Sequence, residues 1–305
     1  MNTYKYIIEK IQYKAKNYKL QLVLHNILHT PPATIGNDEF VLLSMVHHKD
    51  VKNYLLAVKT FCSYIHPKKI IVIADKSLNA YDFDILKKHV NGVEIFPSEK
   101  FANPDIPKGG TWERLIAISE INTIDYVVQL DADTVTIGEI IEIKNNIKES
   151  CSFLIGTEDN QKFLPVYQAA LWAKEKEKEI DHIQITAEAV MDRFIKGKSA
   201  YYTRGCSGFS GFAKGVLSRE LLVDLSRSMR DVLKERVNEW GTEQFASNYI
   251  ISNTTKSSVL PHPKYCHPDK INATTVFIHF IGYLRFKTSF YDKMAKKFIQ
   301  ECARN

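Results

Sequence analysis

Short apolar runs alternate with amphipathic segments along the first half of the chain. Four runs have the length and apolar character of buried strands: Phe40–Val46, Lys69–Ala74, Gly92–Phe96 and Asp125–Leu130. The segments between them carry apolar residues at helical spacing and predict helices over Val51–Tyr64, Tyr81–Val90 and Trp112–Ile121. Strands that alternate with helices in this way run parallel and are joined by crossovers. The pattern therefore predicts an α/β fold whose sheet is covered by helices on both faces.

The second half of the chain has a less regular pattern. Apolar runs predict strands at Ser152–Gly156 and Thr275–Phe280, and helical spacing predicts helices at Val166–Ile180 and Ser218–Val237. Residues Tyr4–His29 combine helical spacing with many lysines. They predict one or two helices, which either pack on the globular part or lie on a membrane surface. The segment after them, Thr30–Asn37, contains proline and glycine and predicts a linker.

Composition narrows the class of protein. The 305 residues are 45% hydrophobic and 25% charged, as in an ordinary globular protein with one large domain or two closely joined ones. No apolar run reaches the length of a membrane span, and the N-terminus does not resemble a secretory signal. The five cysteines are scattered and form no CxxC pair, which favours a reducing compartment. We therefore expect a cytoplasmic protein, with peripheral contact to the inner face of a membrane as an open alternative.

The net charge of +6 adds one more indication about partners. A mildly basic chain suits an anionic small molecule or a membrane surface. The lysines and arginines form no block with interleaved aromatic residues, so we expect no nucleic-acid partner.

The strongest chemical signal is a pair of aspartates, Asp131 and Asp133, directly after the apolar run that ends at Leu130. At this point the chain leaves the sheet and can turn both carboxylates toward one ion. Carboxylate oxygens suit hard divalent cations such as Mg²⁺ and Mn²⁺, which in proteins commonly bridge to substrate phosphates. Ligands of parallel sheets bind beyond the carboxyl ends of the strands. The ends of neighbouring strands carry His47, His48 and Asp75, and we expect these side chains to border the same ligand.

The same aspartates also fit a different chemistry. The run Asp131–Val135 matches the D-x-D-x-[TV] pattern of haloacid-dehalogenase-like phosphatases, in which the first aspartate, here Asp131, is the nucleophile. That family opens its domain with the motif, whereas about 130 residues of α/β pattern precede it here. Its late acidic pair has a poor counterpart in Glu158–Asp159, which follows too soon. The phosphatase stays an alternative.

A histidine that ends the late apolar run supplies a candidate third ligand. His279 is followed by Gly282 and Arg285, and the spacing resembles the H-x-x-G-x-x-K motif of glycogenin-like and galactosyltransferase-like retaining glycosyltransferases of the GT-A fold. The resemblance implies that His279 joins Asp131 and Asp133 as a ligand of Mn²⁺ (or Mg²⁺). It also implies that Arg285, in place of the lysine, binds the diphosphate of a nucleotide sugar.

The resemblance extends over further islands of the sequence. Arg114, in Trp112–Leu115, corresponds to an arginine that points at the donor in that family. Gly205–Phe212 resembles the family's N-S-G loop, with Cys206 in place of the asparagine, and implies that Ser207 and Gly208 shape the sugar pocket. Trp240–Phe245 resembles the acid-Gln pair that opens a helix. It implies that Glu243 and Gln244 face the reacting sugar or the acceptor, although an acid in a first helical turn is also favoured for local reasons.

The resemblance thus implies a GT-A-like fold with flanking helices. We expect an N-terminal helical segment and linker (1–36), a domain (37–287) and a C-terminal helix (288–305). Within the domain, a Rossmann-like nucleotide-sugar half (37–135) is fused to an acceptor half (136–287). The donor-binding candidates are His47, Asp75, Arg114, Ser207, Gly208, Gly282, Arg285 and Lys287.

The expected reaction is transfer of a hexosyl unit from a nucleoside diphosphate sugar, by resemblance a UDP-sugar, to a hydroxyl of a glycan, lipid-linked or protein acceptor. The H-x-x-G resemblance favours retention at the anomeric carbon. In an inverting enzyme, Glu243 would be the general base. A non-catalytic protein that binds nucleotide sugars is a further alternative.

Overall fold

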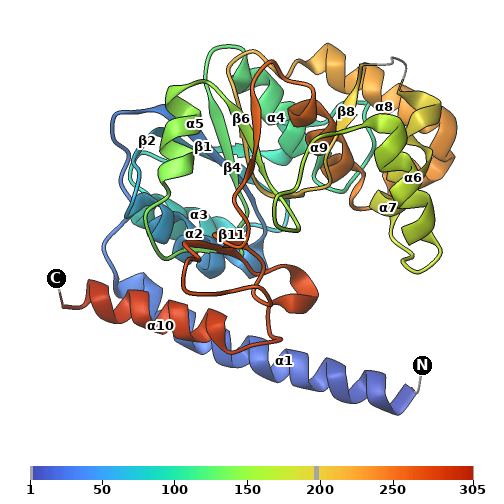
Figure 1. The fold of residues 1–305 in the computed structure, drawn as a ribbon. Coiled ribbons are helices and arrows are strands. Elements are labelled where there is room, and N and C mark those ends of the chain that lie inside the picture. The colour runs from blue at the N-terminus through green and yellow to red at the C-terminus, as the bar shows by residue number, and fades with distance from the viewer. Residues whose placement is uncertain (1–2, 196–198, 305) are drawn as a thin grey trace.

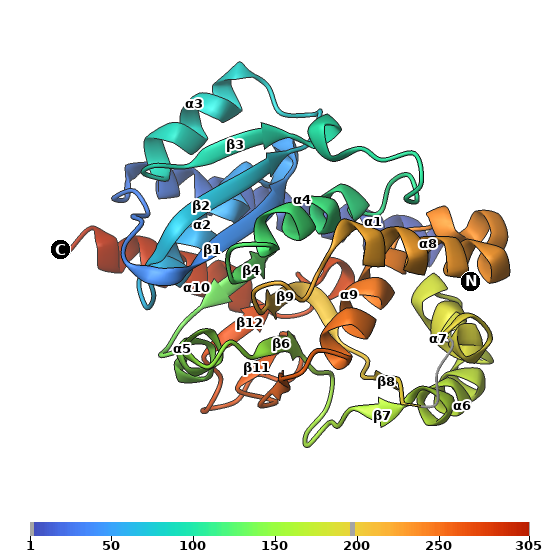
Figure 2. The ribbon, with the colours of Figure 1, turned by 90° about the horizontal axis from the view of Figure 1, so that it is seen from above.

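A seven-stranded mixed sheet forms the centre of the molecule and has helices on both faces (Figures 1 and 2). The computed structural model describes residues 3–195 and 199–304. The strands follow in the order β10-β6-β9-β4-β1-β2-β3. Their bounds are β1 Asp38–Val46, β2 Pro67–Ala74, β3 Glu94–Pro97, β4 Val127–Leu130, β6 Ser152–Ile155, β9 Cys206–Phe212 and β10 Ser257–Leu260.

The predicted strand–helix alternation is confirmed in the first half of the chain. β1 pairs in parallel with both β2 and β4, and β2 pairs in parallel with β3. Neighbouring residues of β1 belong to opposite faces: Leu42 packs in one hydrophobic cluster, and Val41 and Leu43 pack in the other. The strand is apolar at every second position on both faces because helices cover both sides, which explains its continuous apolar run.

The helices lie close to where the sequence predicts them, with two additions, α5 and α7. Their bounds are α1 Thr3–His25, α2 Val51–Cys62, α3 Ala80–His89, α4 Trp112–Asn122, α5 Ile141–Lys148, α6 Val166–Glu177, α7 Ile183–Phe194, α8 Arg219–Leu233, α9 Thr242–Ser252 and α10 Phe290–Cys302. The N-terminal segment forms one α-helix followed by a 3₁₀ turn at Asn26–His29. Within the described residues, no helix is long and apolar enough to cross a membrane.

One expectation about local structure is wrong. The glycine-rich segment around Gly208 resembles a loop, but it forms β9, a strand in the middle of the sheet. β9 runs antiparallel to β4 on one side and to β6 on the other. Gly211 allows this position because a Cβ atom there would lie 2.2 Å from Cε1 of Phe153 on β6. Contacts on both sides therefore hold a segment of low strand propensity in the sheet.

A small second sheet crosses the carboxyl end of β4. It contains β5 (Thr134–Thr136), β12 (Phe277–His279) and β11 (Tyr265–Cys266), in the order β11-β12-β5. β5 follows β4 after only three residues, so the two aspartates lie in the turn between the large and the small sheet. A third, two-stranded sheet pairs β7 (Leu164–Pro165) with β8 (Tyr201–Tyr202) near α6 and α7.

Candidate metal and donor site

The turn between β4 and β5 holds Asp131 and Asp133 in place through its backbone. The Asp131 N–H donates to the carbonyl of Gly208 on β9 at 2.8 Å, and the Thr134 hydroxyl donates to the carbonyl of Asp131 at 2.9 Å. The Asp133 carbonyl accepts from the N–H of Phe280 at 2.8 Å. Strands on both sides therefore fix the turn, and both carboxylates lie at the carboxyl edge of the large sheet.

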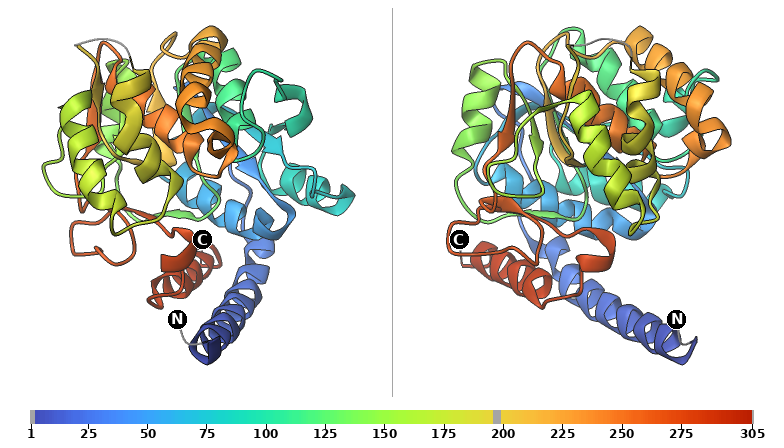
Figure 3. Two further views of the ribbon diagram at one scale, coloured as in Figure 1. Left: turned by 90° about the vertical axis from the view of Figure 1, so that its right-hand side faces the viewer. Right: turned by 45° about the vertical axis from the view of Figure 1, so that its right-hand side comes forward.

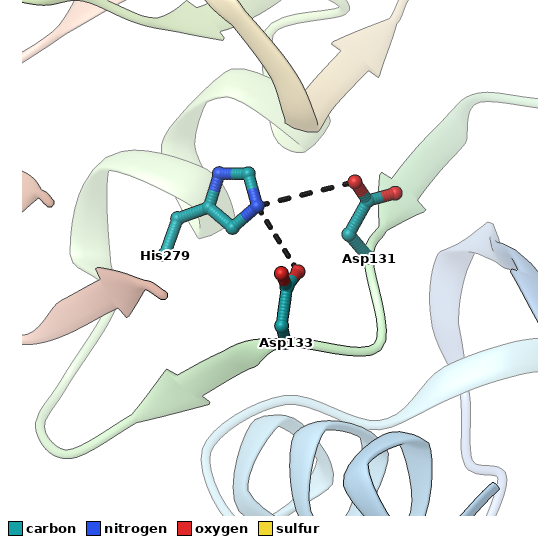
Figure 4. Close-up of side chains that lie close together, drawn as sticks. All are labelled: Asp131, Asp133 and His279. Carbon is teal, nitrogen blue, oxygen red and sulfur yellow. Dashed lines mark hydrogen bonds and ion pairs between the residues drawn. The ribbon is translucent and has the colours of Figure 1, made fainter. Parts of the chain in front are cut away.

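The register of β12 on β5 brings His279 to the aspartates. His279 pairs with Thr134 in the antiparallel ladder. Its Nε2 atom lies 3.1 Å from Oδ1 of Asp133 and 3.9 Å from Oδ2 of Asp131 (Figure 4). One ligand atom from each of the three residues lies within 4.8 Å of the others. Two carboxylates and one imidazole form a donor set that suits a divalent cation such as Mn²⁺.

Residues behind the imidazole fix its orientation. The Nδ1 atom of His279 lies 3.2 Å from Sγ of Cys206, and the ring is 4% exposed. The ring lies directly over Gly208, where a Cβ atom would be 1.9 Å from Cε1 of His279. The glycine thus makes room for the ring, and the cysteine holds its far side, so that Nε2 faces the aspartates.

Cationic side chains balance the carboxylates in the free protein. Arg285 donates from Nη2 to Oδ2 of Asp133 at 2.7 Å and lies 3.8 Å from Asp50. Burial disfavours the charged Asp133 carboxylate, but His279 and Arg285 outweigh it and hold the pKa of Asp133 below its usual value. Burial likewise disfavours the imidazolium, but Cys206 and Asp133 raise the pKa of His279. The site therefore favours positive charge between the carboxylates.

A buried arginine connects the aspartates to α9. Arg114, which is 3% exposed, donates to Oδ1 of Asp131 at 2.5 Å and to Oε1 of Glu243 at 3.2 Å. The indole N–H of Trp112 donates to the Thr242 hydroxyl at 2.9 Å, which ties the first turn of α4 to that of α9. Burial raises the pKa of Glu243, and Arg114 opposes that shift. Its second oxygen, Oε2, has no hydrogen-bond partner among the described residues.

Ser207 and Gln244 continue this polar network. The Ser207 backbone N–H donates to Oε1 of Gln244 at 3.1 Å, and its hydroxyl lies 3.2 Å from both Glu243 Oε1 and Gln244 Oε1. The acid-Gln pair lies in the first turn of α9, as predicted. The Gln244 amide also donates to Gln184 on α7, whose own amide donates to Glu188 at 2.9 Å. No helix was predicted from the sequence at α7, so the extension of the network through Gln184 and Glu188 was missed.

A second group of predicted residues lies on an adjoining cleft. Nδ1 of His47 lies 3.2 Å from Oδ1 of Asp75, and both side chains line a cavity of about 430 Å³. Gly110, Glu113 and Trp240 also line it, so the cleft reaches the chain segments beside Arg114 and α9.

His48 does not join this group. Its Nδ1 atom lies 2.6 Å from Asp82 in the first turn of α3. This contact places His48 at the start of α3, and its expected role beside the ligand stays a prediction.

Two predicted donor-binding residues, Gly282 and Lys287, follow His279 in the sequence. Gly282 begins the 3₁₀ turn Gly282–Leu284, and a Cβ atom there would meet no atom of the described, non-adjacent residues within 4 Å. Its backbone does not need glycine, but the space in front of it is open. Lys287 is exposed and lies two residues beyond Arg285. Two further residues at the site were missed: Asp50, near Arg285, and Cys206 as a contact of His279. Neither carries a sequence signal, since each is far along the chain from its partner.

The fold has counterparts among solved structures. A structure of the bifunctional glycosyltransferase WbbM matches with a TM-score of 0.53 at 12% sequence identity, over 89% of this chain and 53% of that chain. The fold is of the GT-A type. The chain spans about half the length of the WbbM chain, and at this identity the likeness concerns the fold alone.

Two further matches have lower TM-scores. The galactosyltransferase LgtC, in complex with donor and acceptor sugar analogues, matches with a TM-score of 0.46 at 9% identity, over 85% of this chain and 96% of that one. Mouse xyloside xylosyltransferase 1 matches with a TM-score of 0.45 at 10% identity, over 79% and 97%. No family model and no curated protein matches the sequence.

Proposed function

We propose that the chain is a metal-dependent glycosyltransferase that moves a hexosyl unit from a nucleoside diphosphate sugar, by preference a UDP-sugar, to a hydroxyl of a glycan, lipid-linked or protein acceptor. The observation that carries the proposal is the convergence of Asp131, Asp133 and His279 from two segments 146 residues apart, with ligand atoms within 4.8 Å. The group lies at the carboxyl edge of a GT-A-type sheet, where ligands of such sheets bind.

The donor set fits a resident Mn²⁺ or Mg²⁺ held by Asp131, Asp133 and His279. When bound, such an ion supplies Lewis-acid stabilisation of the charge that develops on the leaving diphosphate. Arg285 and Arg114 already lie within hydrogen-bond distance of the two aspartates. They add fixed positive charge beside the diphosphate, and Arg285 can exchange its contact with Asp133 for phosphate oxygens.

The other residues divide between donor binding and the reacting centre. The cleft of His47 and Asp75 is assigned to the nucleoside, and the open space at Gly282, with Lys287 beyond it, to the diphosphate. Ser207 and Gly208 form the floor of the site beside the metal ligands. Glu243 and Gln244 hold the sugar or the acceptor hydroxyl from the first turn of α9. The buried Glu243 carboxylate has a raised pKa, and one of its oxygens has no hydrogen-bond partner within the described part of the chain. It is therefore suited to a proton-sharing contact there.

The phosphatase alternative finds less support. Its nucleophile, Asp131, accepts a hydrogen bond from Arg114. Of the acidic pair that this chemistry would need, Asp159 lies 2.9 Å from His262 instead. A covalent phosphoryl or beryllofluoride adduct on Asp131 would nevertheless decide for that alternative.

The function is tested by incubating the protein with UDP-, GDP- and CDP-sugars in the presence of Mn²⁺ or EDTA. Thermal-shift measurements identify the nucleotide that binds, and release of nucleoside diphosphate measures turnover. We expect stabilisation and slow donor hydrolysis with one nucleotide class, each only with the metal. Binding without transfer or hydrolysis toward any acceptor would favour the non-catalytic alternative.

A further inference from the structure

The N-terminal helix α1 and the C-terminal helix α10 lie side by side on the outside of the α/β body (Figure 1). The second half of α1 is anchored in the core, where Leu20 and Leu24 are fully buried. The first half extends beyond the α/β body, as both views in Figure 3 show. From Ile8 onward, the helix therefore has a side that the described residues do not cover.

That uncovered side carries an apolar stripe. Ile8, Ile11, Tyr18 and Leu22 are 40%, 61%, 67% and 56% exposed, and the exposed Ala15 lies between them. The spacings along the stripe are three, four, three and four residues, so the five side chains share one side of the helix. Exposed apolar side chains that line up in this way indicate an interaction surface. We call Ile8, Ile11, Ala15, Tyr18 and Leu22 the α1 stripe.

Positive charge is concentrated on the same pair of helices. The sequences of α1 and α10 contain eight lysines and three acidic residues, a net charge of +5 out of +6 for the whole chain. At 100° per residue, Lys14 and Lys19 flank the α1 stripe on its two sides, and both are exposed. Lysines that flank an apolar side can extend their ammonium groups outward while their stems lie along it.

The charges distinguish between two possible occupants of the stripe. The three-four spacing would also suit a second copy of the helix in a coiled coil. In such a pair the flanking positions would bring Lys14 and Lys19 toward further lysines, because Glu9 is the single acid in the whole helix. An anionic lipid surface meets the same lysines with opposite charge and accepts the apolar stripe at its acyl boundary.

We propose that α1 lies in the interface of an anionic membrane, with the α1 stripe buried among the lipids and the flanking lysines at the headgroups. The surface is connected to the candidate metal site. Tyr13 of α1 packs edge-on against Phe286, with the two ring centroids 4.9 Å apart, and the Lys16 ammonium donates to the Phe286 carbonyl at 3.0 Å. Phe286 directly follows Arg285, so membrane binding would hold the segment that carries the site close to the lipid surface.

The test is co-sedimentation of the full chain with extruded vesicles of phosphatidylcholine alone or with one third phosphatidylglycerol. We expect binding to the anionic vesicles that weakens as salt rises, and at least about tenfold weaker binding to the neutral ones. The triple variant I11E/Y18E/L22E should lose at least about tenfold in affinity for the anionic vesicles. The matched control I124E/I141E/L171E changes three apolar residues that are exposed elsewhere, and it should bind like the wild type.

Charge is tested separately, with K14E/K19E against the control K214E/K256E, whose lysines are also exposed. K14E/K19E should weaken binding to the anionic vesicles, and K214E/K256E should not. Circular dichroism and thermal melting check that every variant is folded. Absence of binding to anionic vesicles, or equal loss in the control variants, would overturn the proposal. A dimer that only I11E/Y18E/L22E dissociates would assign the stripe to a second copy instead. None of these measurements depends on sugar transfer.

Discussion

A Cβ atom on residue 208 would lie 1.9 Å from Cε1 of His279, so the imidazole occupies its place only because residue 208 is glycine. Gly208 lies on β9 and His279 on β12, strands of two different sheets. The contact sets the position of the ring relative to Asp131 and Asp133. The geometry of the candidate metal site therefore depends on the absence of a Cβ atom at residue 208.

Gly208→Ala is therefore expected to displace His279 and to weaken Mn²⁺-dependent nucleotide binding by at least about tenfold, near 1.4 kcal/mol. Isothermal titration calorimetry measures the affinity, and thermal melting measures the stability. The double variant G208A/H279A removes the clash. It should be at least as stable as G208A while its metal-dependent binding stays weak. If G208A binds Mn²⁺ and nucleotide as tightly as the wild type, metal binding does not depend on the position that Gly208 gives to the His279 ring.

His279→Ala should change which metal the protein prefers. A ring nitrogen favours Mn²⁺ over Mg²⁺, which prefers an all-oxygen shell. The wild type should bind nucleotide more tightly with Mn²⁺ than with Mg²⁺, and the variant should lose much of that preference while remaining folded. Titrations with each ion, run beside a thermal melt, make the comparison. A variant with lower stability and an unchanged preference would leave His279 a structural residue.

Glu243→Gln should lower turnover far more than donor affinity. The carboxylate is buried beside Arg114 and Ser207, and one of its oxygens has no hydrogen-bond partner among the described residues. Its proposed partner is therefore the reacting sugar or the acceptor. An interaction made mainly in the transition state appears as a loss of kcat with little change in KM. We expect a loss on the order of a hundredfold. Ser247→Ala, a buried position on the same helix, is the control for packing. Wild-type turnover in the glutamine variant would reduce Glu243 to an acid that supports the helix start.

The strands β1, β2, β3 and β4 were predictable because each lies in a short, mostly apolar run. β9 was not, because Gly208, Ser210 and Gly211 give it low strand propensity, and its place between β4 and β6 comes from tertiary contacts. The pairing of Asp133 with His279 spans 146 residues. No local pattern contains it, and only the resemblance to a known motif indicated it. The network through Gln184 and Glu188 was missed because α7 was not predicted.

A buried histidine outside the site predicts how stability responds to pH. Burial, and secondarily the neighbouring Lys59, lowers the pKa of His89 to about 4, and its Nδ1 lies 3.2 Å from the Lys59 ammonium. Between pH 6.5 and 4 the unfolded chain binds the proton that the folded chain excludes, so stability falls as the pH falls through this window. Between pH 7 and 4.5 the wild type should lose on the order of 2 kcal/mol more than His89→Gln, which does not titrate.

Urea unfolding at the two pH values measures this difference. The glutamine of His89→Gln keeps a hydrogen-bond acceptor for Lys59. The free energy of unfolding of each protein at pH 7 is the reference for its loss at pH 4.5. Parallel losses in the two proteins would show that His89 is not the group responsible.

The most direct test of the central claim is calorimetric titration of a nucleoside diphosphate, UDP first, into the wild type and Asp133→Asn. Each protein is measured with Mn²⁺ and with EDTA. Because Asp133 contacts both His279 and Arg285, its carboxylate is central to the proposed metal site. We predict tight binding by the wild type only with Mn²⁺, and binding by Asp133→Asn that is at least about tenfold weaker. Equal affinity of the wild type with Mn²⁺ and with EDTA would contradict the account.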